Sequence, residues 1–200
     1  MFRFMLLLCL LMGVSGSSLA QKAIYDPVYY GKLTSHRGLK GLGVVRPQGR
    51  PVSREQWTDM ERLWMARSVV GEASFLALEE HVEIAWVYAT IARQKGLSLL
   101  RVIKGYSAAV KQRSTKTRKW ILELKLNGSK PRHWPSNLSW KVHKKLWFRI
   151  LDNLEEWAKG NRPSKLDGAN HFGGDMDTPG IRWVKLDAPY ANSFYRAEAK

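Results

Sequence analysis

One glutamate in this sequence is a candidate for acid–base chemistry. Glu72 lies in Gly71-Glu72-Ala73 at the end of an expected helix, with Val69 and Val70 just before it. An apolar environment disfavours the charged form of a carboxyl, so a glutamate placed there can carry a proton to a substrate. A helix-end glutamate that points into water is the ordinary alternative, and composition alone favours it. A second polar stretch further along the chain strengthens the case for chemistry.

That second stretch runs from Asp167 to Asp177 and is rich in glycine. Glycine lets the backbone approach a ligand closely, so the histidine and the acids here could bind, orient or protonate one. Glycoside cleavage generally uses two carboxyl groups, one as acid and the other as base or nucleophile. Asp175 and Asp177 are therefore candidates for a second carboxylate beside Glu72. A turn with a capped histidine, His171, is the alternative that the same residues allow.

The histidines do not predict a metal site. They are scattered along the chain, and no His-Glu-x-x-His spacing occurs that would place two of them on one helix face. His171 and Asp175 are four residues apart, but Gly173-Gly174 between them argues against a helix that would bring them together. We therefore expect neither a metal nor a cofactor.

Two helices are expected to position Glu72. Ser53-Arg-Glu-Gln56 has the form of a capping box, and apolar residues at helical spacing follow it towards Glu72. A second helix, from about Leu78 to Gln94, is apolar almost all round, so it is expected at the centre of the core with Gly96 as its C-cap. The polar residues near its start are expected to be solvated: Glu79, Glu80, His81 and Glu83.

The elements expected after these two helices are short, except for one long helix. A short helix is expected from Leu99 to Lys104, and a long one from Ser139 to about Lys159. Apolar and other residues alternate in part from Trp120 to Leu126, so this segment is compatible with a short strand and with a helix. The loop from Pro131 to Pro135 presents Trp134 between two prolines, and this ring is the best candidate to stack on a sugar.

The charge distribution indicates an anionic partner. The chain of 200 residues has a net charge of +16, is 44% hydrophobic and contains nine tryptophans, which is typical of one globular domain. Residues 101–149 hold fourteen Lys or Arg and a single acid, Glu123. A solvated charged face is the usual meaning of such a run. Its one-sided sign nevertheless favours contact with a polyanion, such as an anionic envelope polymer or a nucleic acid.

The N-terminus predicts export. Residues 1–20 carry a basic residue, an apolar run and the small-residue ending Ser18-Leu19-Ala20, which is typical of a cleaved secretory signal peptide. Residues 21–52 are turn-rich and are expected to form an arm or linker, and residues 53–200 the catalytic domain. Cys9, the single cysteine, would leave with the signal peptide. We expect a periplasmic, cell-wall or extracellular protein with no stable transmembrane segment after processing and no nucleic-acid partner.

Several motifs, in a fixed order, resemble a known family. They span about residues 60–196 and are Gly71-Glu72-Ala73, a Val/Ala/Ile-rich helix, Tyr106-Ser107, a long helix ending at Gly160, Gly168-Ala-Asn-His-Phe172, Trp183 and Phe194-Tyr195. This ordered set resembles the cell-wall hydrolase family that includes spore-cortex-lytic enzymes and related phage and bacterial lysins. The resemblance implies an α+β, mostly α-helical, lysozyme-like domain with a small β element and long loops.

The resemblance also implies an activity. Glu72 would be the catalytic acid of a peptidoglycan lytic transglycosylase, protonating the glycosidic oxygen between N-acetylmuramic acid and N-acetylglucosamine. It would then act as base on the muramoyl 6-hydroxyl, giving a 1,6-anhydro product. Further residues are expected to bind the glycan strand: Tyr106, Ser107, His171, Phe172, Asp177 and Trp183. Trp134 is added to them because of its loop position.

The chain departs from the family at three places. Thr90-Ile91 stands where Asn-Arg is common, His81 where glutamine is common, and Gly173-Gly174-Asp175 follows His-Phe. These differences concern the substrate subsites more than the acid. Two rival interpretations remain open: a muramidase-like hydrolase that uses Asp175 or Asp177, and a non-catalytic cationic protein that binds the envelope or another polyanion.

Overall fold

The computed structural model describes residues 50–111, 119–166, 168–173 and 181–199. The expected signal peptide and most of the expected arm lie outside the described residues, as do Asp167, Asp175 and Asp177. Helices and one small antiparallel sheet make up the described part, so the α+β, mostly helical fold class is confirmed.

Helix α3 (Asp59–Glu72) carries the candidate acid as its last residue, but it begins later than predicted. The expected capping box forms, with the Ser53 N–H donating to Gln56 Oε1 and the Gln56 N–H to Ser53 Oγ, yet it closes an isolated turn. A second box follows at once: the Thr58 side chain accepts a hydrogen bond from the Glu61 N–H and caps α3. Two successive boxes in the sequence explain the misplaced helix start.

Helix α4 (Leu78–Lys95) is the central helix of the core, as predicted. All residues from Glu80 to Ala92 are buried, and Gly96 ends the helix in the left-handed conformation, with φ at 59°. The expectation that the polar residues near its start are solvated is correct for Glu79 alone. The other three are buried, with exposed fractions of 3% for Glu80, 0% for His81 and 1% for Glu83.

Within the described residues, four further helices pack around these two. Three are short, α5 (Leu99–Tyr106), α6 (Ala108–Lys111) and α7 (Lys119–Glu123), and one is long, α8 (Trp140–Ala158). The segment after Trp120, left open above, is therefore helical, and α8 matches its predicted bounds closely. Helix α3 contacts each of the other described helices, α4 to α8, and Glu72 is its last residue.

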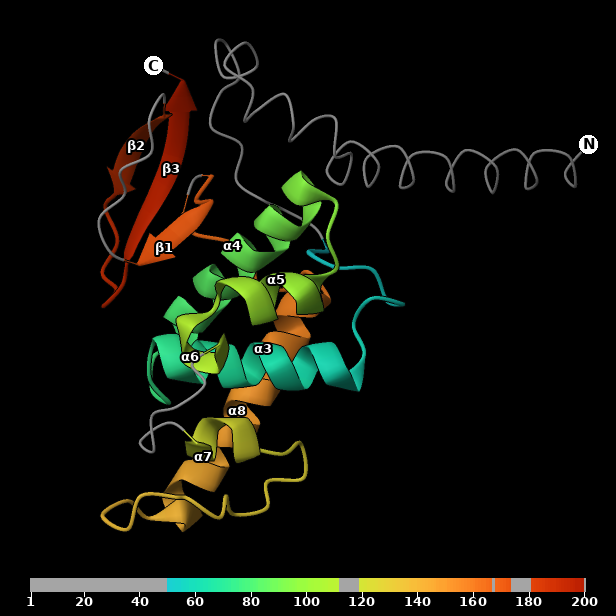
Figure 1. Cartoon of the computed structure of the whole chain (residues 1–200), viewed down its shortest axis with the longest axis vertical. Helices are drawn as coiled ribbons and strands as arrows, with labels where there is room; N and C mark the ends of the chain where they lie inside the picture. The colour runs from blue at the N-terminus through green and yellow to red at the C-terminus, as the bar shows by residue number, and fades with distance from the viewer. Residues whose placement is uncertain (1–49, 112–118, 167, 174–180, 200) are drawn as a thin grey trace, which may run out of the picture.

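The small β element is a three-stranded antiparallel sheet. Its strands are β1 (His171–Gly173), β2 (Ile181–Leu186) and β3 (Ser193–Ala199), in the order β1-β3-β2. His171 pairs with Tyr195 across the β1–β3 ladder. Figure 1 shows the sheet at one end of the molecule, α3 to α6 in the middle, and α7 with the start of α8 at the other end.

Tryptophans fill much of the core, as their helical spacing predicted. Trp86, Trp147 and Trp157 are at most 1% exposed, and Trp157 meets both Trp57 and Trp86 edge to face. The indole N–H groups of Trp86 and Trp147 donate to backbone carbonyls, which satisfies these buried donors. Within the described ranges, no helix is both long and apolar enough to cross a membrane.

Candidate active site at the end of helix α3

The carboxyl group of Glu72 is held at one of its two oxygens. The Ser107 hydroxyl donates a hydrogen bond of 2.7 Å to Glu72 Oε1, and the Ala109 backbone N–H donates a second of 2.9 Å to the same oxygen. Ser107 is the residue between α5 and α6, and Ala109 lies in α6. The link from α5 to α6 therefore fixes the direction in which the Glu72 side chain leaves α3.

The second oxygen of this carboxyl is left for other contacts. No residue that the structure describes forms a hydrogen bond with Glu72 Oε2, and the Glu72 residue is half-buried. An oxygen that already accepts two hydrogen bonds has its lone pairs occupied, so a proton on the neutral carboxyl belongs on Oε2. The arrangement can thus present an acidic O–H in a defined direction, which is what a general acid needs.

Buried hydroxyl groups continue from Glu72 into the core. The Ser68 hydroxyl donates to Tyr88 Oη at 2.9 Å, and Ser68 lies one turn before Glu72 on the same face of α3. Burial is the main cause that raises the pKa of Tyr88, and the negative charge of Glu72 raises it further. Tyr88 is therefore a neutral phenol next to the site. Ser68, Tyr88 and Ser107 are each at most 1% exposed, so these hydroxyls lie in a dry environment.

Gly71 explains how α6 comes so close to the carboxyl. A Cβ atom added at Gly71 would lie 2.2 Å from Ala109 Cβ and 3.2 Å from Ile121 Cδ1. Only a residue without a side chain lets α3 and α6 approach to this distance. The glycine before Glu72 therefore brings the Ala109 N–H within hydrogen-bond range of Glu72, which gives a physical reason for the Gly71-Glu72 pair.

The loop between β2 and β3 is fastened to the same helix end. Asn192 Nδ2 donates to the Glu72 backbone carbonyl at 3.0 Å and to Glu80 Oε1 at 2.7 Å. The Asn192 N–H also donates to Glu80 Oε1, at 2.8 Å. Sequence reasoning missed both Asn192 and Glu80, since they are 112 residues apart and an asparagine in a loop is common. Glu80 is thus a structural acid that joins the sheet to the site.

Four of the residues expected to bind substrate come from two places, the end of α5 and strand β1. Ser107 contacts Glu72 directly, and the adjacent Tyr106 is 46% exposed at the end of α5. The Phe172 ring meets the Tyr88 ring edge to face at 5.5 Å, which places it on the side of the hydroxyl network. His171 must point to the opposite face of β1, because side chains alternate along a strand.

His171 and Trp183 come together, but on that opposite face. Their ring centroids are 5.6 Å apart, from strands β1 and β2. Burial lowers the pKa of His171, which favours its neutral form. The pair forms a small aromatic surface on the sheet, and no described contact joins it to Glu72.

The expectation that Trp134 offers an exposed ring is wrong. Trp134 is 7% exposed, and its indole N–H donates to the Leu138 carbonyl at 2.9 Å. The rings of Phe75, Trp120 and Trp140 pack against it edge to face. A loop position with flanking prolines does not decide exposure, because the loop folds back over α8. Trp134 supports the segment that follows Glu72 through Phe75.

A metal-dependent site has no support from the described side chains. In residues 50–111, 119–166, 168–173 and 181–199, no three His, Cys, Asp or Glu residues group closely enough to hold a metal ion.

No family model, no curated protein and no solved structure matches this chain.

Proposed function

We propose that this chain is an exported peptidoglycan lytic transglycosylase with a lysozyme-like catalytic domain and Glu72 as its general acid and base. The observation that carries the proposal is the asymmetry of the Glu72 carboxyl. Oε1 is held by Ser107 and Ala109, whereas Oε2 has no partner among the described residues. Together with the ordered motifs of the sequence, this favours a glutamate that exchanges a proton with a substrate.

In the proposed reaction, Glu72 Oε2–H gives its proton to the glycosidic oxygen that follows N-acetylmuramic acid. The bond from C1 to that oxygen breaks, and positive charge develops at C1 of the muramoyl residue. The Glu72 carboxylate then takes the proton of the muramoyl 6-hydroxyl, whose oxygen attacks C1 and closes the 1,6-anhydro ring. The acid is thereby regenerated, and the strand is cut without water.

The transglycosylase version needs one carboxyl group, and one further acid near Glu72 is already engaged within the protein. Glu80, an acid close to the same helix end, already accepts from the Ala191 and Asn192 backbone N–H groups and from Asn192 Nδ2. It is 3% exposed, so it cannot serve as a second base in solvent. A hydrolase would instead require Asp175 or Asp177, which lie outside the described residues.

The decisive experiment is digestion of purified peptidoglycan, with mass spectrometry of the released fragments. We expect anhydro-muropeptides from the parent protein and a loss of at least about a hundredfold in Glu72→Gln, because the amide cannot donate an acidic proton. Glu55→Gln is the matched control, since Glu55 is an exposed glutamate before α3.

Each other outcome of this digestion changes the proposal in a definite way. Reducing-end products that disappear in Asp175→Asn or Asp177→Asn would indicate a hydrolase with a second carboxylate. Equal release by the parent and by Glu72→Gln would show that Glu72 is not the acid. No release by any variant, with the protein still bound to the sacculi, would favour the non-catalytic envelope-binding alternative.

A further inference from the structure

The outer face of the first half of α8 carries cations and apolar side chains together. Lys141, Lys144, Lys145 and Arg149 are exposed, and Val142 is 56% exposed among them. These residues follow one another at helical spacing, so they share the side of α8 that faces away from the core. Residues 141–149 of this side are called the α8 basic face below.

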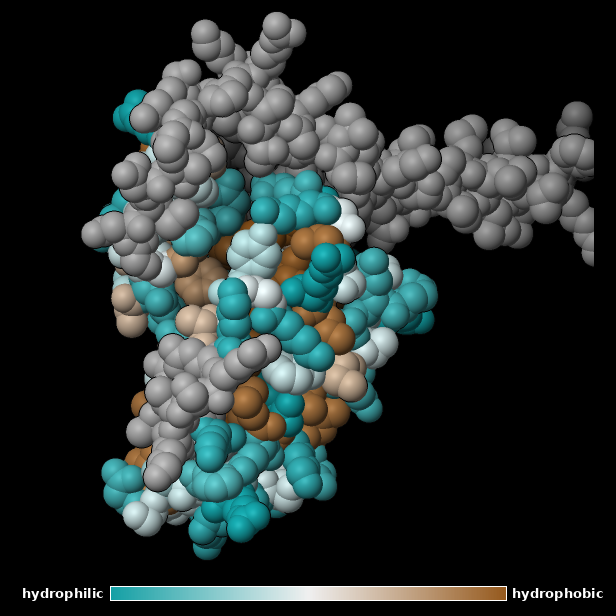
Figure 2. Space-filling model, in the orientation of Figure 1, coloured by the Kyte–Doolittle hydropathy of each residue, from teal (hydrophilic) through white to brown (hydrophobic). Residues whose placement is uncertain are grey.

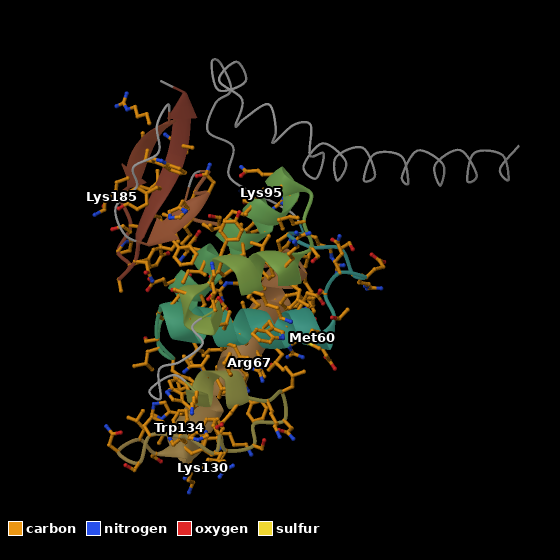
Figure 3. All side chains as sticks on the ribbon, in the orientation of Figure 1. Met60, Arg67, Lys95, Lys130, Trp134 and Lys185 are labelled. Carbon is orange, nitrogen blue, oxygen red and sulfur yellow. The ribbon has the colours of Figure 1, made fainter. Side chains whose placement is uncertain are left out.

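Neighbouring residues extend the same mixture. Phe148 of α8 is 37% exposed, and the Lys144 ammonium lies 5.9 Å from the centre of its ring. In the preceding segment Lys125, Lys130 and Arg132 are exposed, and Leu138 is 38% exposed. Figure 3 shows Lys130 at the end of the molecule opposite the sheet, and hydrophilic residues cover most of that end in Figure 2.

The cations of this end lack acidic partners. None of the seven lysines and arginines named above forms an ion pair within the described part of the chain. Glu123, the single acid of residues 101–149, is bound by the backbone N–H and the ring of His133. Asp152 is the next acid on α8, and its Oδ1 lies 4.0 Å from Arg62 Nη2. The positive potential here is therefore available to an external anion.

We propose that the α8 basic face docks on the surface of a bilayer rich in anionic phospholipid. Lysine and arginine side chains are attracted to anionic headgroups, and apolar side chains on the same face enter the boundary between headgroups and acyl chains. Val142 and Phe148 are the exposed apolar side chains of this face that such insertion would use. A nucleic acid would use the cations through its phosphates but would leave the exposed apolar side chains without a role. The proposal goes beyond glycan cleavage and does not depend on Glu72.

The test is co-sedimentation of the form that begins at Gln21 with vesicles of phosphatidylglycerol or phosphatidylcholine. This form keeps every helix and strand that the structure describes. We expect binding to phosphatidylglycerol vesicles and not to phosphatidylcholine vesicles. Each cation near an anionic surface strengthens binding about fivefold. Replacement of Lys141, Lys144, Lys145 and Arg149 by glutamine should therefore weaken binding roughly several hundredfold, and Val142→Ser about three- to tenfold.

A matched control removes the same charge elsewhere. Arg54, Arg101, Arg182 and Lys185 are exposed cations outside this face, and their replacement by glutamine should cost much less affinity. Equal losses in the two fourfold variants would overturn the proposal, since net charge alone would then explain binding. A second result would also overturn it: Val142→Ser binds phosphatidylglycerol vesicles as tightly as the parent, and short double-stranded DNA binds the parent as tightly as the vesicles do.

Glycan cleavage at Glu72 and membrane docking by the α8 basic face can be tested separately. Glu72→Gln should bind vesicles like the parent, whatever its effect on peptidoglycan. The fourfold α8 variant should still release muropeptides from lipid-free peptidoglycan if the parent does. If the fourfold variant loses its cooperative thermal unfolding, Val142→Ser decides the question, because Val142 is 56% exposed. We expect Val142→Ser to keep the unfolding temperature of the parent and to bind the vesicles less tightly.

Discussion

The two oxygens of Glu72 are distinguished by a few neighbouring atoms. The Ser107 hydroxyl has one proton, and it points this proton at Glu72 Oε1. The Ala109 N–H donates to the same oxygen, and Oε2 has no hydrogen-bond partner among the described residues. The two donors at Oε1, one from the Ser107 side chain and one from the Ala109 backbone, therefore fix the orientation of the carboxyl.

Removal of the Ser107 hydroxyl tests this orientation. A hydrogen bond to a charged group contributes about 1.5–3 kcal/mol, so Ser107→Ala should lower the kcat of peptidoglycan cleavage roughly 10- to 100-fold, with KM changing about twofold or less. Ser68→Ala is the matched control, because Ser68 donates to Tyr88 and not to Glu72. Steady-state kinetics and thermal unfolding of both variants provide the measurement. A similar kcat loss in both would contradict a specific role for Ser107.

At the scale of elements, the site depends on how closely α3 and α6 pack. Gly71 is the point of closest approach, with Ala109 Cβ on the other side. Arg67, one turn earlier on α3, donates through Nε and Nη2 to the Leu124 carbonyl just after α7. Figure 3 shows Arg67 near the middle of α3, on the side that faces α7. The last two turns of α3 thus hold both short helices in place.

The packing predicts a destabilising Gly71→Ala and its rescue. The added methyl group would meet Ala109 Cβ at 2.2 Å, and overpacking of this kind costs about 1–3 kcal/mol. The Ala109 N–H would move away from Glu72, so cleavage should fall as well. Gly71→Ala with Ala109→Gly removes the clashing methyl and should recover part of both losses. Denaturant unfolding and peptidoglycan cleavage would measure them, and additive losses in the double variant would contradict the contact.

The sequence predicted the elements whose signal is local. The apolar run of α4 with Gly96, and the spaced tryptophans of α8, identify their helices without knowledge of the rest of the chain. The α3 start could not be predicted, because Ser53 and Thr58 both begin capping boxes and the sequence does not rank them. Trp134 could not be placed either, because its burial depends on rings from α7, α8 and the segment after α3.

The candidate site was only partly predictable for the same reason. Glu72 was identified by its motif and Ser107 by its order after it. Their hydrogen bond joins residues 35 apart, and no periodicity reports it. Glu80 and Glu83 of α4 were misjudged as solvated, because their partners come from segments 81 to 112 residues away.

At the scale of the whole molecule, these buried acids of α4 hold the C-terminal third of the chain. Glu80 binds the loop before β3, as described above. Glu83 accepts from the Ser164 hydroxyl at 2.5 Å and from the Lys165 N–H at 2.7 Å, which fastens the segment after α8. Burial raises the pKa of Glu83, although these hydrogen bonds oppose the shift. The central helix therefore anchors the C-terminal segments by charge-assisted hydrogen bonds as well as by apolar packing.

His81 makes this core sensitive to acid. It is 0% exposed, and neither ring nitrogen has a hydrogen-bond partner among the described residues. Burial lowers the pKa of His81 to about 4, against a smaller opposing effect of the Ser74 backbone. The unfolded chain binds a proton at this histidine below about pH 6.5, whereas the folded chain does so only near pH 4. The stabilising contribution is therefore complete above about pH 6.5 and is lost as the pH falls towards 4.

We expect the free energy of unfolding of the parent to fall by about 3 kcal/mol from this cause between pH 6.5 and 4. His81→Leu removes the titrating group, so its unfolding free energy should change less over the same range, whatever its value at neutral pH. Glu83 acts in the opposite direction, since its raised pKa favours the folded chain as the pH falls, but it is present in both proteins and cancels in the comparison. Urea unfolding of the two proteins at half-unit pH steps measures the difference. Parallel curves would show that His81 is protonated or solvated in the folded protein, because only a buried neutral histidine gives the parent the steeper slope.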